Sequence, residues 1–483
     1  RNYWHGAEHA FSHSPARLVL RDVVVRDTLA NVDDGGDGQG LLIANGLHAL
    51  LERVLIERSR TAGLWVFGSE AAVTGTDLAV RDTQGRQSDG IMGWGVWVQD
   101  GALARLARVA VDRNRAIGVV LRGRGTAAAM ADLAVRSTQV QESDGEWGEG
   151  IWIEDGAVAD VDRVLLEGNR EVGAMVTGAG AVLRASDLAV RDTQPCTSPA
   201  SWEYGYGLHA MDSGRVEVTR AIIERNTTAG VHAGSGLGPG GTPAGSIRLS
   251  DVIVRDTLAG ADGLTGFGLA GGLGAHVAVD RSMFVRNVGV AILVAEEAAV
   301  LDARDIVVAD TLSDARGMAG RGLGVQDGAR ASLLRAVLER NREIGVFVSG
   351  EGAVASMTDV AIRDIAERVC AADSCTGFGG GMGGGAYGGG HLEMSRFLVT
   401  GSALCGVQVA HGADESGARL SVGGTIDLHH GEVSFNTVCG ANVQTDGFDV
   451  ARLMDNVLFR GNGQNLDMSD LPVPDPAAPL EGP

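Results

Sequence analysis

The sequence predicts an all-β solenoid, a parallel β-helix with two coils in each repeat of about 55 residues. A segment of the type DLAVRDT recurs at a nearly fixed period, starting at Asp22, Asp77, Asp132, Asp187, Asp251, Asp305 and Asp359. Apolar and polar residues alternate between the turns, which is typical of half-buried strands. The chain has 73 glycines and only 4% aromatic residues, which favours short strands and turns. We expect the β-helix to span residues 1–466 and a proline-rich tail or linker to span 467–483.

Each repeat divides into a long and a short coil. The long coil is typified by residues 77–102, in which DLAVRDTQ is followed by a loop and then GVWVQDGA. The short coil is typified by residues 109–123, VAVDRNRAIGVVLRG. Because side chains of a strand alternate between its two faces, Leu78 and Val80 are expected to point inward. Stacked coils then lie about 4.8 Å apart.

A column of small polar residues is predicted at the turn that follows the first strand of each coil. Such side chains bond the local backbone and the neighbouring coil, as stacked asparagine ladders do. The members are Thr28, Ser59, Thr83, Asn114, Thr138, Asn169, Thr193, Asn226, Thr257, Asn287, Thr311, Asn341, Ser402, Asn436 and Asn462.

The charged pair just before this column alternates in order between coils. Long coils carry Arg then Asp, as at Arg81 and Asp82, whereas short coils carry an acid then Arg, as at Glu57 and Arg58. Stacking therefore places each arginine between acids of adjacent coils. Each exposed pair contributes only about 0.2–1 kcal/mol, but a slip of one residue would be penalised in every coil. We interpret the alternation as a device that specifies register.

Composition excludes several functions. The formal net charge of −21 argues against nucleic-acid partners and against attraction to an anionic membrane. All 40 basic residues are arginine, so Schiff-base and P-loop lysine chemistry is excluded. There is no run of 18 apolar residues that would span a membrane as a helix.

The cysteines indicate an oxidising compartment. Cys370 and Cys375 bracket a short loop, and a local disulfide is favoured over zinc because no second close Cys or His pair accompanies them. Cys405 and Cys439 occupy equivalent positions of successive coils, within disulfide reach. We therefore expect an extracytoplasmic protein, secreted or on the outer cell surface, and read the chain as part of a longer secreted precursor.

An outer column of apolar and aromatic residues is predicted on the outward face of the strand after the turn, where an isolated solenoid would be polar. Three interpretations stay open: cover by the loops of the long coils, a protein partner or neighbouring subunit, and stacking of sugars. The outer column comprises Leu42, Trp65, Trp97, Trp152, Met175, His209 and His232, and the loops carry Trp94, Trp147 and Trp202.

Few residues suggest chemistry. The run DDGGDG offers Asp33, Asp34 and Asp37 as calcium ligands, but it lacks the final glutamate of an EF-hand loop, which favours a solvated loop. A metal site at His209 and His232 is conceivable, although two surface histidines are the simpler reading. No GxSxG, HExxH, P-loop or CxxC motif occurs, so no catalytic residue and no cofactor other than calcium is predicted.

Segments such as RVLIERSRTAGLWVFG, DLAVRDTQ and ERNREIGVFVSGEGA resemble the right-handed parallel β-helix repeat proteins of myxobacteria and related bacteria. The resemblance covers about residues 16–466 and implies a pectin-lyase-like fold and an extracytoplasmic surface protein. Catalytic members of that fold use clustered Asp with Arg, Lys or His. Lysine and a Gly-His-Gly signature are absent here, so no catalytic role is carried over.

Together these observations predict a non-enzymatic extracellular scaffold, adhesin or assembly subunit. Its expected partners are a protein, or further copies joined through the helix ends or the outer column. The alternative is a protein that binds or cleaves polysaccharide, because tryptophans beside acidic loops are what a carbohydrate groove needs.

Overall fold

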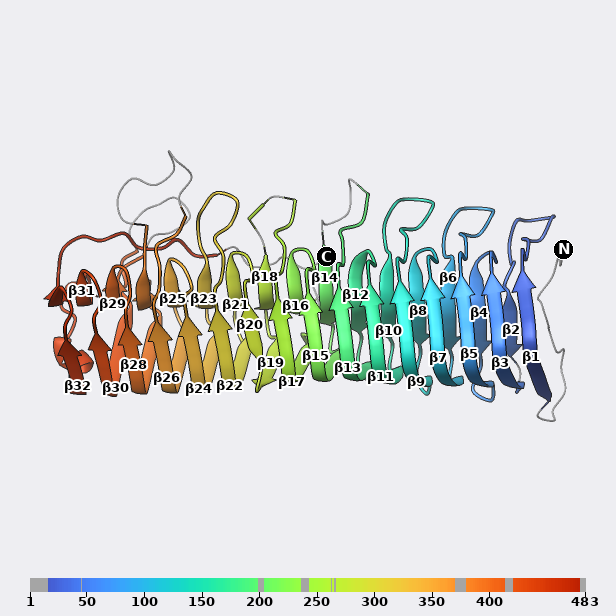
Figure 1. The fold of residues 1–483 in the computed structure, drawn as a ribbon, viewed down its shortest axis with the longest axis horizontal. Coiled ribbons are helices and arrows are strands. Elements are labelled where there is room, and N and C mark those ends of the chain that lie inside the picture. Colours follow the sequence, from blue (N-terminus) through green and yellow to red (C-terminus); the bar gives the residue numbers. More distant parts are fainter. Residues whose placement is uncertain are drawn as a thin grey trace. The chain divides into compact units, whose positions relative to one another are not determined.

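The computed structural model describes residues 16–44, 46–198, 204–235, 243–261, 263–264, 266–369, 379–412 and 420–477. They belong to two compact units, one of residues 1–227 with 238–247 and one of residues 228–237 with 248–482. In each unit the strands form two parallel sheets, A and B, and the chain alternates between them (Figure 1). The predicted right-handed parallel β-helix is thereby confirmed.

In the first unit, sheet A has ten-residue strands and sheet B has strands of four to seven residues. Sheet A comprises β1 (Arg17–Arg26), β3 (His48–Glu57), β5 (Ala72–Arg81), β7 (Leu103–Asp112), β9 (Ala127–Arg136), β11 (Val158–Glu167), β13 (Val182–Arg191) and β15 (Arg215–Glu224). Sheet B comprises β2 (Leu41–Ala44), β4 (Ala62–Phe67), β6 (Trp94–Gln99), β8 (Ile117–Arg122), β10 (Glu149–Glu154), β12 (Glu171–Thr177) and β14 (Gly205–Met211).

The second unit repeats this arrangement and adds one short 3-10 helix, η1 (Val450–Leu453). Sheet A comprises β17 (Ser246–Arg255), β19 (His276–Asp280), β20 (Met283–Val285), β22 (Val300–Ala309), β24 (Arg330–Glu339), β26 (Val354–Arg363), β28 (His391–Thr400), β30 (Thr425–Ser434) and β32 (Asp455–Arg460). Sheet B comprises β16 (Ala229–Ala233), β18 (Phe267–Gly271), β21 (Val290–Ala295), β23 (Arg321–Gln326), β25 (Ile344–Ser349), β27 (Met382–Tyr387), β29 (Cys405–Ala410), β31 (Cys439–Val443) and β33 (Gln464–Asp467).

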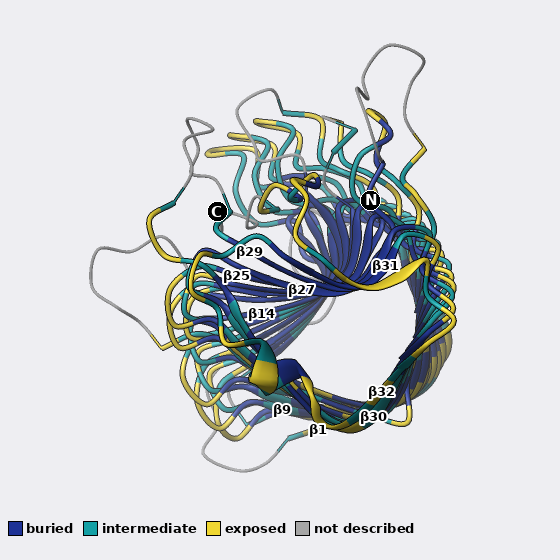
Figure 2. Ribbon diagram, turned by 90° about the vertical axis from the view of Figure 1, so that its left-hand side faces the viewer, coloured by how far each residue is buried: buried dark blue, intermediate teal, exposed yellow. Residues whose placement is uncertain are grey.

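The long strands of sheet A bend at one residue with positive φ. In β5 this residue is Asp77, at φ 57°, and in β7 it is Arg108, at φ 53°. The predicted inward positions after the bend are buried, since Leu78 is 2% and Val80 0% exposed. Figure 2 shows the strands of sheet B coloured as buried and many of the turns between strands coloured as exposed. The core of each unit therefore lies between the two sheets.

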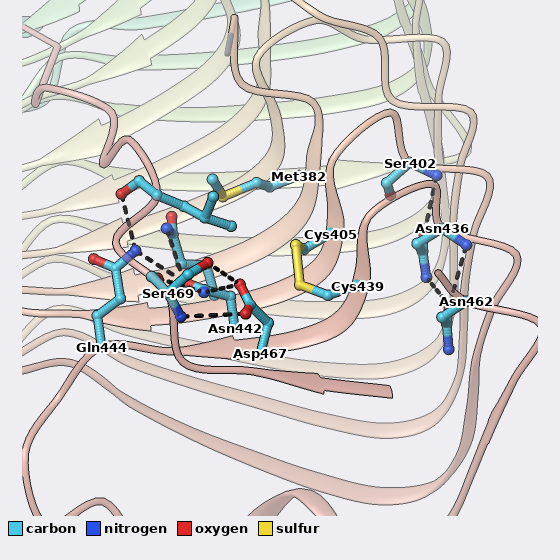
Figure 3. The surroundings of a disulfide bond; sticks show 12 residues. Met382, Ser402, Cys405, Asn436, Cys439, Asn442, Gln444, Asn462, Asp467 and Ser469 are labelled. Atoms are coloured by element: carbon cyan, nitrogen blue, oxygen red, sulfur yellow. Dashed lines mark hydrogen bonds between the residues drawn. A yellow bond between two sulfur atoms is a disulfide. The ribbon is translucent and has the colours of Figure 1, made fainter. Parts of the chain in front are cut away.

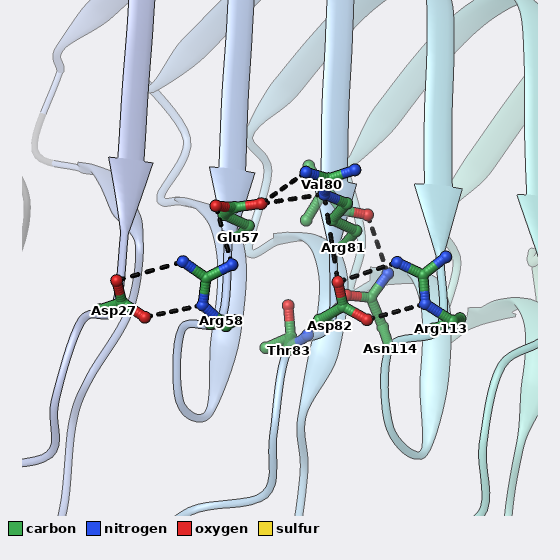
Figure 4. A network of polar contacts seen from close by, with 9 residues as sticks. All are labelled: Asp27, Glu57, Arg58, Val80, Arg81, Asp82, Thr83, Arg113 and Asn114. Carbon is green, nitrogen blue, oxygen red and sulfur yellow. Dashed lines mark hydrogen bonds and ion pairs between the residues drawn. The ribbon is translucent and has the colours of Figure 1, made fainter.

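The predicted charge alternation is confirmed as a chain of ion pairs between coils. Arg58 Nε lies 2.7 Å from Asp27 Oδ1, and Arg81 Nη2 lies 2.7 Å from Glu57 Oε2 (Figure 4). In both pairs the arginine belongs to the later coil and the acid to the preceding one, and the two pairs lie in adjacent columns, as the alternating order of acid and arginine requires. Register is accordingly kept, with Glu57 opposite Arg81 in the ladder between β3 and β5.

A second row of ion pairs, which the sequence analysis missed, lies at the bend itself. Arg108 Nε lies 2.6 Å from Asp77 Oδ1, and both residues have positive φ. The other pairs of this row are Asp22–Arg53, Asp132–Arg163, Asp187–Arg220, Asp251–Arg281, Asp305–Arg335 and Asp359–Arg396. The arginine lowers the pKa of its aspartate, chiefly through the side-chain hydrogen bond, at Asp22, Asp77, Asp132, Asp187, Asp305 and Asp359.

The polar column is confirmed at its asparagines, whereas the hydroxyls of Thr28, Ser59, Thr83 and Ser402 are buried without a hydrogen-bond partner. Asn114 is 1% exposed, its Oδ1 accepts from the backbone N–H of Thr83 at 3.0 Å, and its Nδ2 donates to the Val80 carbonyl at 3.1 Å. The same pattern recurs at Asn169 and Asn341. These amides satisfy backbone groups that the turn removes from the strand ladder.

Cys405 and Cys439 lie opposite each other in β29 and β31 and form the predicted disulfide, with a Cα–Cα distance of 4.5 Å (Figure 3). Cys370 and Cys375 lie outside the described residues. Among the described residues there is no helix of a length and apolarity that would cross a membrane.

Candidate functional site

The first five members of the outer column lie on the outer face of sheet B in the first unit, in one column of its ladder in which Val120 stands between Trp97 and Trp152. Leu42 pairs with Trp65, Trp65 with Trp97, and Trp152 with Met175. The rings of Trp65 and Trp97 are parallel within 1°, with centroids 4.3 Å apart. Strand register therefore turns residues far apart in sequence into one aromatic stack.

The long loops, residues 27–40, 82–93 and 137–148, lie beside this column. Aromatic residues at the end of a loop, or at the start of the strand that follows it, help to cover the column. The ring of Trp94 meets that of Trp97 edge-on at 4.4 Å, and Trp147 stacks on Trp152 at 4.6 Å. Met92 packs against the same cluster, and Trp97 is only 7% exposed. Two of the three predicted loop aromatics therefore cover the outer column.

Trp202 lies outside the described residues. Leu42, Trp65, Trp152 and Met175 are half-buried rather than open. The tryptophans thus form a small apolar cluster on the outside of the sheet.

Three indole N–H groups within this cluster have no acceptor. They are the Nε1 groups of Trp65, Trp97 and Trp152, and each is buried. A buried donor without a partner costs about 1–3 kcal/mol.

Two carboxyl groups, that of the buried Glu149 and that of the half-buried Glu171, lie beside Trp147. Glu149, the first residue of β10, is 1% exposed, and its Oε2 accepts from the Gly148 N–H at 3.0 Å. Burial, and secondarily the charge of Glu171, raises the pKa of Glu149 well above its usual range. Burial also raises the pKa of Glu171 to about 7, although a hydrogen bond from the Trp147 backbone acts in the opposite direction. The pair is arranged to hold a proton near neutral pH, which is the property that general acid–base groups need.

Glu149 is one of the acidic residues of the long loops, which a carbohydrate groove would use, whereas Glu171 was not predicted as a site residue. Glu171 occupies a turn position with φ 56°, where sibling coils carry Thr61 and Ala116, also with positive φ. An acid at a position that is small in these sibling coils was the available signal, and Glu343 repeats it in the second unit with φ 54°. It could not reveal burial, which depends on the loop folded over it.

The two histidines of the outer column are buried, at 2% exposure each. His209 meets the Tyr206 ring edge-on at 5.3 Å, and burial lowers the pKa of His232 to about 4. His232 is therefore neutral at physiological pH. His209 and His232 belong to different units. Because both are buried, the interpretation of them as two surface histidines is wrong. Among the described residues there is no group of three or more His, Cys, Asp or Glu that could hold a metal ion.

The loop proposed for calcium is engaged in turn contacts. Asp34 Oδ1 accepts from the Gly36 N–H at 2.8 Å, and the Asp33 N–H donates to Asn31 Oδ1 at 3.0 Å. The Asp37 carbonyl accepts from the Thr61 hydroxyl. Calcium binding here stays a prediction.

In the second unit the outward positions of sheet B become polar toward the C-terminal end. Phe347 is fully buried, and Gln408 and Asn442 are 0% exposed. A buried ion pair joins Arg321 Nε to Glu343 Oε2 at 2.5 Å, with the Arg321 guanidinium 4.5 Å from the centre of the Phe347 ring. The chain segment that follows β33 covers this outer face of sheet B in the second unit.

No family model and no curated protein matches the chain. Among solved structures it is similar to the Vag8–C1 inhibitor complex, at 14% identity and a TM-score of 0.46, covering 97% of this chain and 100% of that one. It is similar to the periplasmic alginate epimerase AlgG double mutant, at 9% identity and a TM-score of 0.34, covering 93% and 85%. It is also similar to the A-module of the Azotobacter vinelandii mannuronan C-5 epimerase AlgE4, at 13% identity and a TM-score of 0.29, covering 78% and 89%. The strand pairing of the chain itself defines its fold.

Proposed function

We propose that the protein is a non-enzymatic extracytoplasmic scaffold that presents its long loops to a protein partner. The observation that carries this proposal is the covered outer column. Stacking on sugars needs an accessible ring face, yet Trp97 is 7% exposed and is contacted by both Trp65 and Trp94. The tryptophan rings pack the loops onto sheet B. The loops are therefore more exposed to solvent than the outer column is.

The charge of these loops bears on the kind of partner. Asp33 and Asp34 are exposed in the first loop, and Glu142 is exposed in the third. Together with the net charge of −21, this favours a partner with a basic surface and an association that weakens with salt. The disulfide between Cys405 and Cys439 supports an extracytoplasmic location.

A second candidate function, cleavage or binding of polysaccharide, is favoured by the Glu149–Glu171 pair. Two carboxyl groups with raised pKa values beside stacked tryptophans provide an acid, a base and a sugar platform. The burial of Glu149 opposes this function, because a substrate reaches it only if Trp147 moves.

We also propose that copies of the protein assemble through the ends of the β-helix. We further propose that the protein is related to the β-helix repeat proteins of myxobacteria. The inward residues of β1, such as Leu18 and Leu20, are half-buried, whereas their ladder partners Ala49 and Leu51 are fully buried. An apolar end of this kind favours stacking of a further coil or copy.

A glycan array and activity assays on uronate polymers distinguish the two functions. We expect the wild-type chain to show neither binding nor turnover. Glycan turnover that is lost in Glu149→Gln but kept in the exposed control Glu142→Gln would instead establish the second candidate. Saturable glycan binding that is lost in Trp147→Ala would also overturn the scaffold proposal.

A further inference from the structure

The chain that follows β33 lies on the outer face of sheet B in the second unit. From Met468 to Ala477 it forms no strand and passes over β29 and β25 toward β23 (red in Figure 1). Leu471 is 7% exposed and Pro474 is buried, whereas Pro472 between them is exposed. The buried residues are three positions apart, which is the spacing of a polyproline II segment that lays one face on the sheet.

Leu471 fills an apolar pocket in that face. The pocket is formed by fully buried residues of four chain segments: Ile344, Phe347, Met382, Tyr387, Leu404, Cys405, Ala410 and Cys439. Val473 packs against the same cluster. The Cys405–Cys439 disulfide ties β29 to β31 in its floor. The pocket thus belongs to the rigid sheet rather than to the segment that it holds.

Side-chain amides bind the backbone of the segment on either side of this pocket. Gln444 Nε2 donates to the Leu471 carbonyl at 2.9 Å, and Gln408 Nε2 donates to the Pro472 carbonyl at 3.3 Å. Asn442 Nδ2 donates to the Ser469 carbonyl at 3.0 Å (Figure 3). These bonds recognise main-chain groups, so they do not depend on which side chains the segment carries.

The most distant amide binds both polar groups of one residue. Gln326 Nε2 donates to the Ala477 carbonyl at 2.8 Å, and Gln326 Oε1 accepts from the Ala477 N–H at 2.9 Å. Gln326 is 1% exposed and Gln408 0%. Gln408 Oε1 in turn accepts from the Tyr387 hydroxyl at 2.8 Å, which orients its amide toward the segment. Amides that are buried and oriented in this way form a built site for a peptide backbone.

We propose that this face is a peptide-binding groove for an extended, proline-containing segment of a partner protein, and that residues 469–477 occupy it as a ligand in cis. Prolines keep such a segment extended before it binds, which lowers the entropic cost of docking. The groove supplies one leucine pocket and amides spaced along the backbone. A partner that carries a leucine followed by spaced prolines makes the same contacts. This groove lies in the second unit and is independent of the role proposed for the long loops.

The test uses the full chain and a labelled synthetic peptide with the sequence of residues 469–477. Leu471→Asp removes the apolar anchor of the resident segment, and Met468→Asp, at a residue that is 70% exposed, is the matched control. Fluorescence anisotropy should show saturable binding of the peptide to the Leu471→Asp chain. Binding to the wild type and the control should be at least about tenfold weaker, because a tethered segment competes at an effective concentration on the order of millimolar.

A labelled peptide that itself carries Leu471→Asp should not bind. Gln326→Ala added to the Leu471→Asp chain should weaken binding of the original peptide about tenfold. If circular dichroism shows that Leu471→Asp does not fold, Leu471→Ala takes its place in the same comparison. Absence of saturable binding to the released chain, or equal binding to it and to the control, would show that residues 469–477 are a fixed strap and would overturn the proposal.

Discussion

Replacement of Asn114 by alanine tests whether the polar column holds successive coils together. The Asn114 side chain is buried and makes two bonds to the preceding coil, one with the Thr83 N–H and one with the Val80 carbonyl. Alanine leaves both backbone groups buried without a partner. At about 1–3 kcal/mol for each such group, we expect a local destabilisation of about 2–6 kcal/mol.

Thr83→Val is the matched control within the same column. Thr83 is 1% exposed and its hydroxyl has no hydrogen-bond partner, so the isosteric valine removes no bond. We expect a change below about 1 kcal/mol, since a buried hydroxyl without a partner contributes nothing favourable. Thr138→Val should cost more than this control, because the Thr138 hydroxyl donates to Asn169 Oδ1 at 2.8 Å.

Native-state hydrogen exchange is the suitable assay, because a solenoid opens locally and its unfolding is not described by one free energy. Peptides that contain the amides of Val80 to Thr83 should lose protection in Asn114→Ala by a factor on the order of 10² or more, the equivalent of about 3 kcal/mol. They should be unchanged in Thr83→Val. Equal protection in the two variants would refute the structural role of the asparagine.

Two further predictions concern the disulfide and the carboxyl pair. Replacement of Cys405 by alanine opens a loop of sequence separation 34 and should destabilise the C-terminal coils by about 3–4 kcal/mol, measured by exchange in β31 against the wild type. Because the folded pKa of Glu171 is raised to about 7 from 4.5, the folded state retains a proton that the unfolded state releases. Stability of the first unit should therefore fall as pH rises between these values, by roughly 1.4 kcal/mol per pH unit for one retained proton. Glu171→Gln should flatten this dependence and Glu142→Gln should not, and a pH profile that Glu171→Gln leaves unaltered contradicts the assignment.

The coil architecture was predictable because it depends on local and nearest-neighbour patterns. Alternation in β5 placed Leu78 inward, and the reversal of Asp and Arg between coils specified which residues stack. The ion pairs at the bends were missed, as at Asp77 and Arg108. The alternation of Asp and Arg at this position is visible in the sequence. The two side chains pair at a backbone bend, however, and the hydrophobic period of the sequence does not indicate that bend.

The candidate sites were predictable only in part. Trp65, Trp97 and Trp152 were correctly aligned in one column, because the repeat itself aligns them. Their accessibility was not predictable, since it depends on how loops of irregular sequence fold back. The same applies to Glu171, whose raised pKa arises from burial.

The sequence alone determined the solenoid, its register, the polar column and the Cys405–Cys439 pairing. Each of these repeats from coil to coil, so a short pattern contains the information. Only the tertiary structure decided that Trp94 and Trp147 cover the outer column, and that Leu471 enters a pocket on the second unit. These contacts join segments that do not repeat, and their formation depends on burial and shape, which a one-dimensional pattern does not specify.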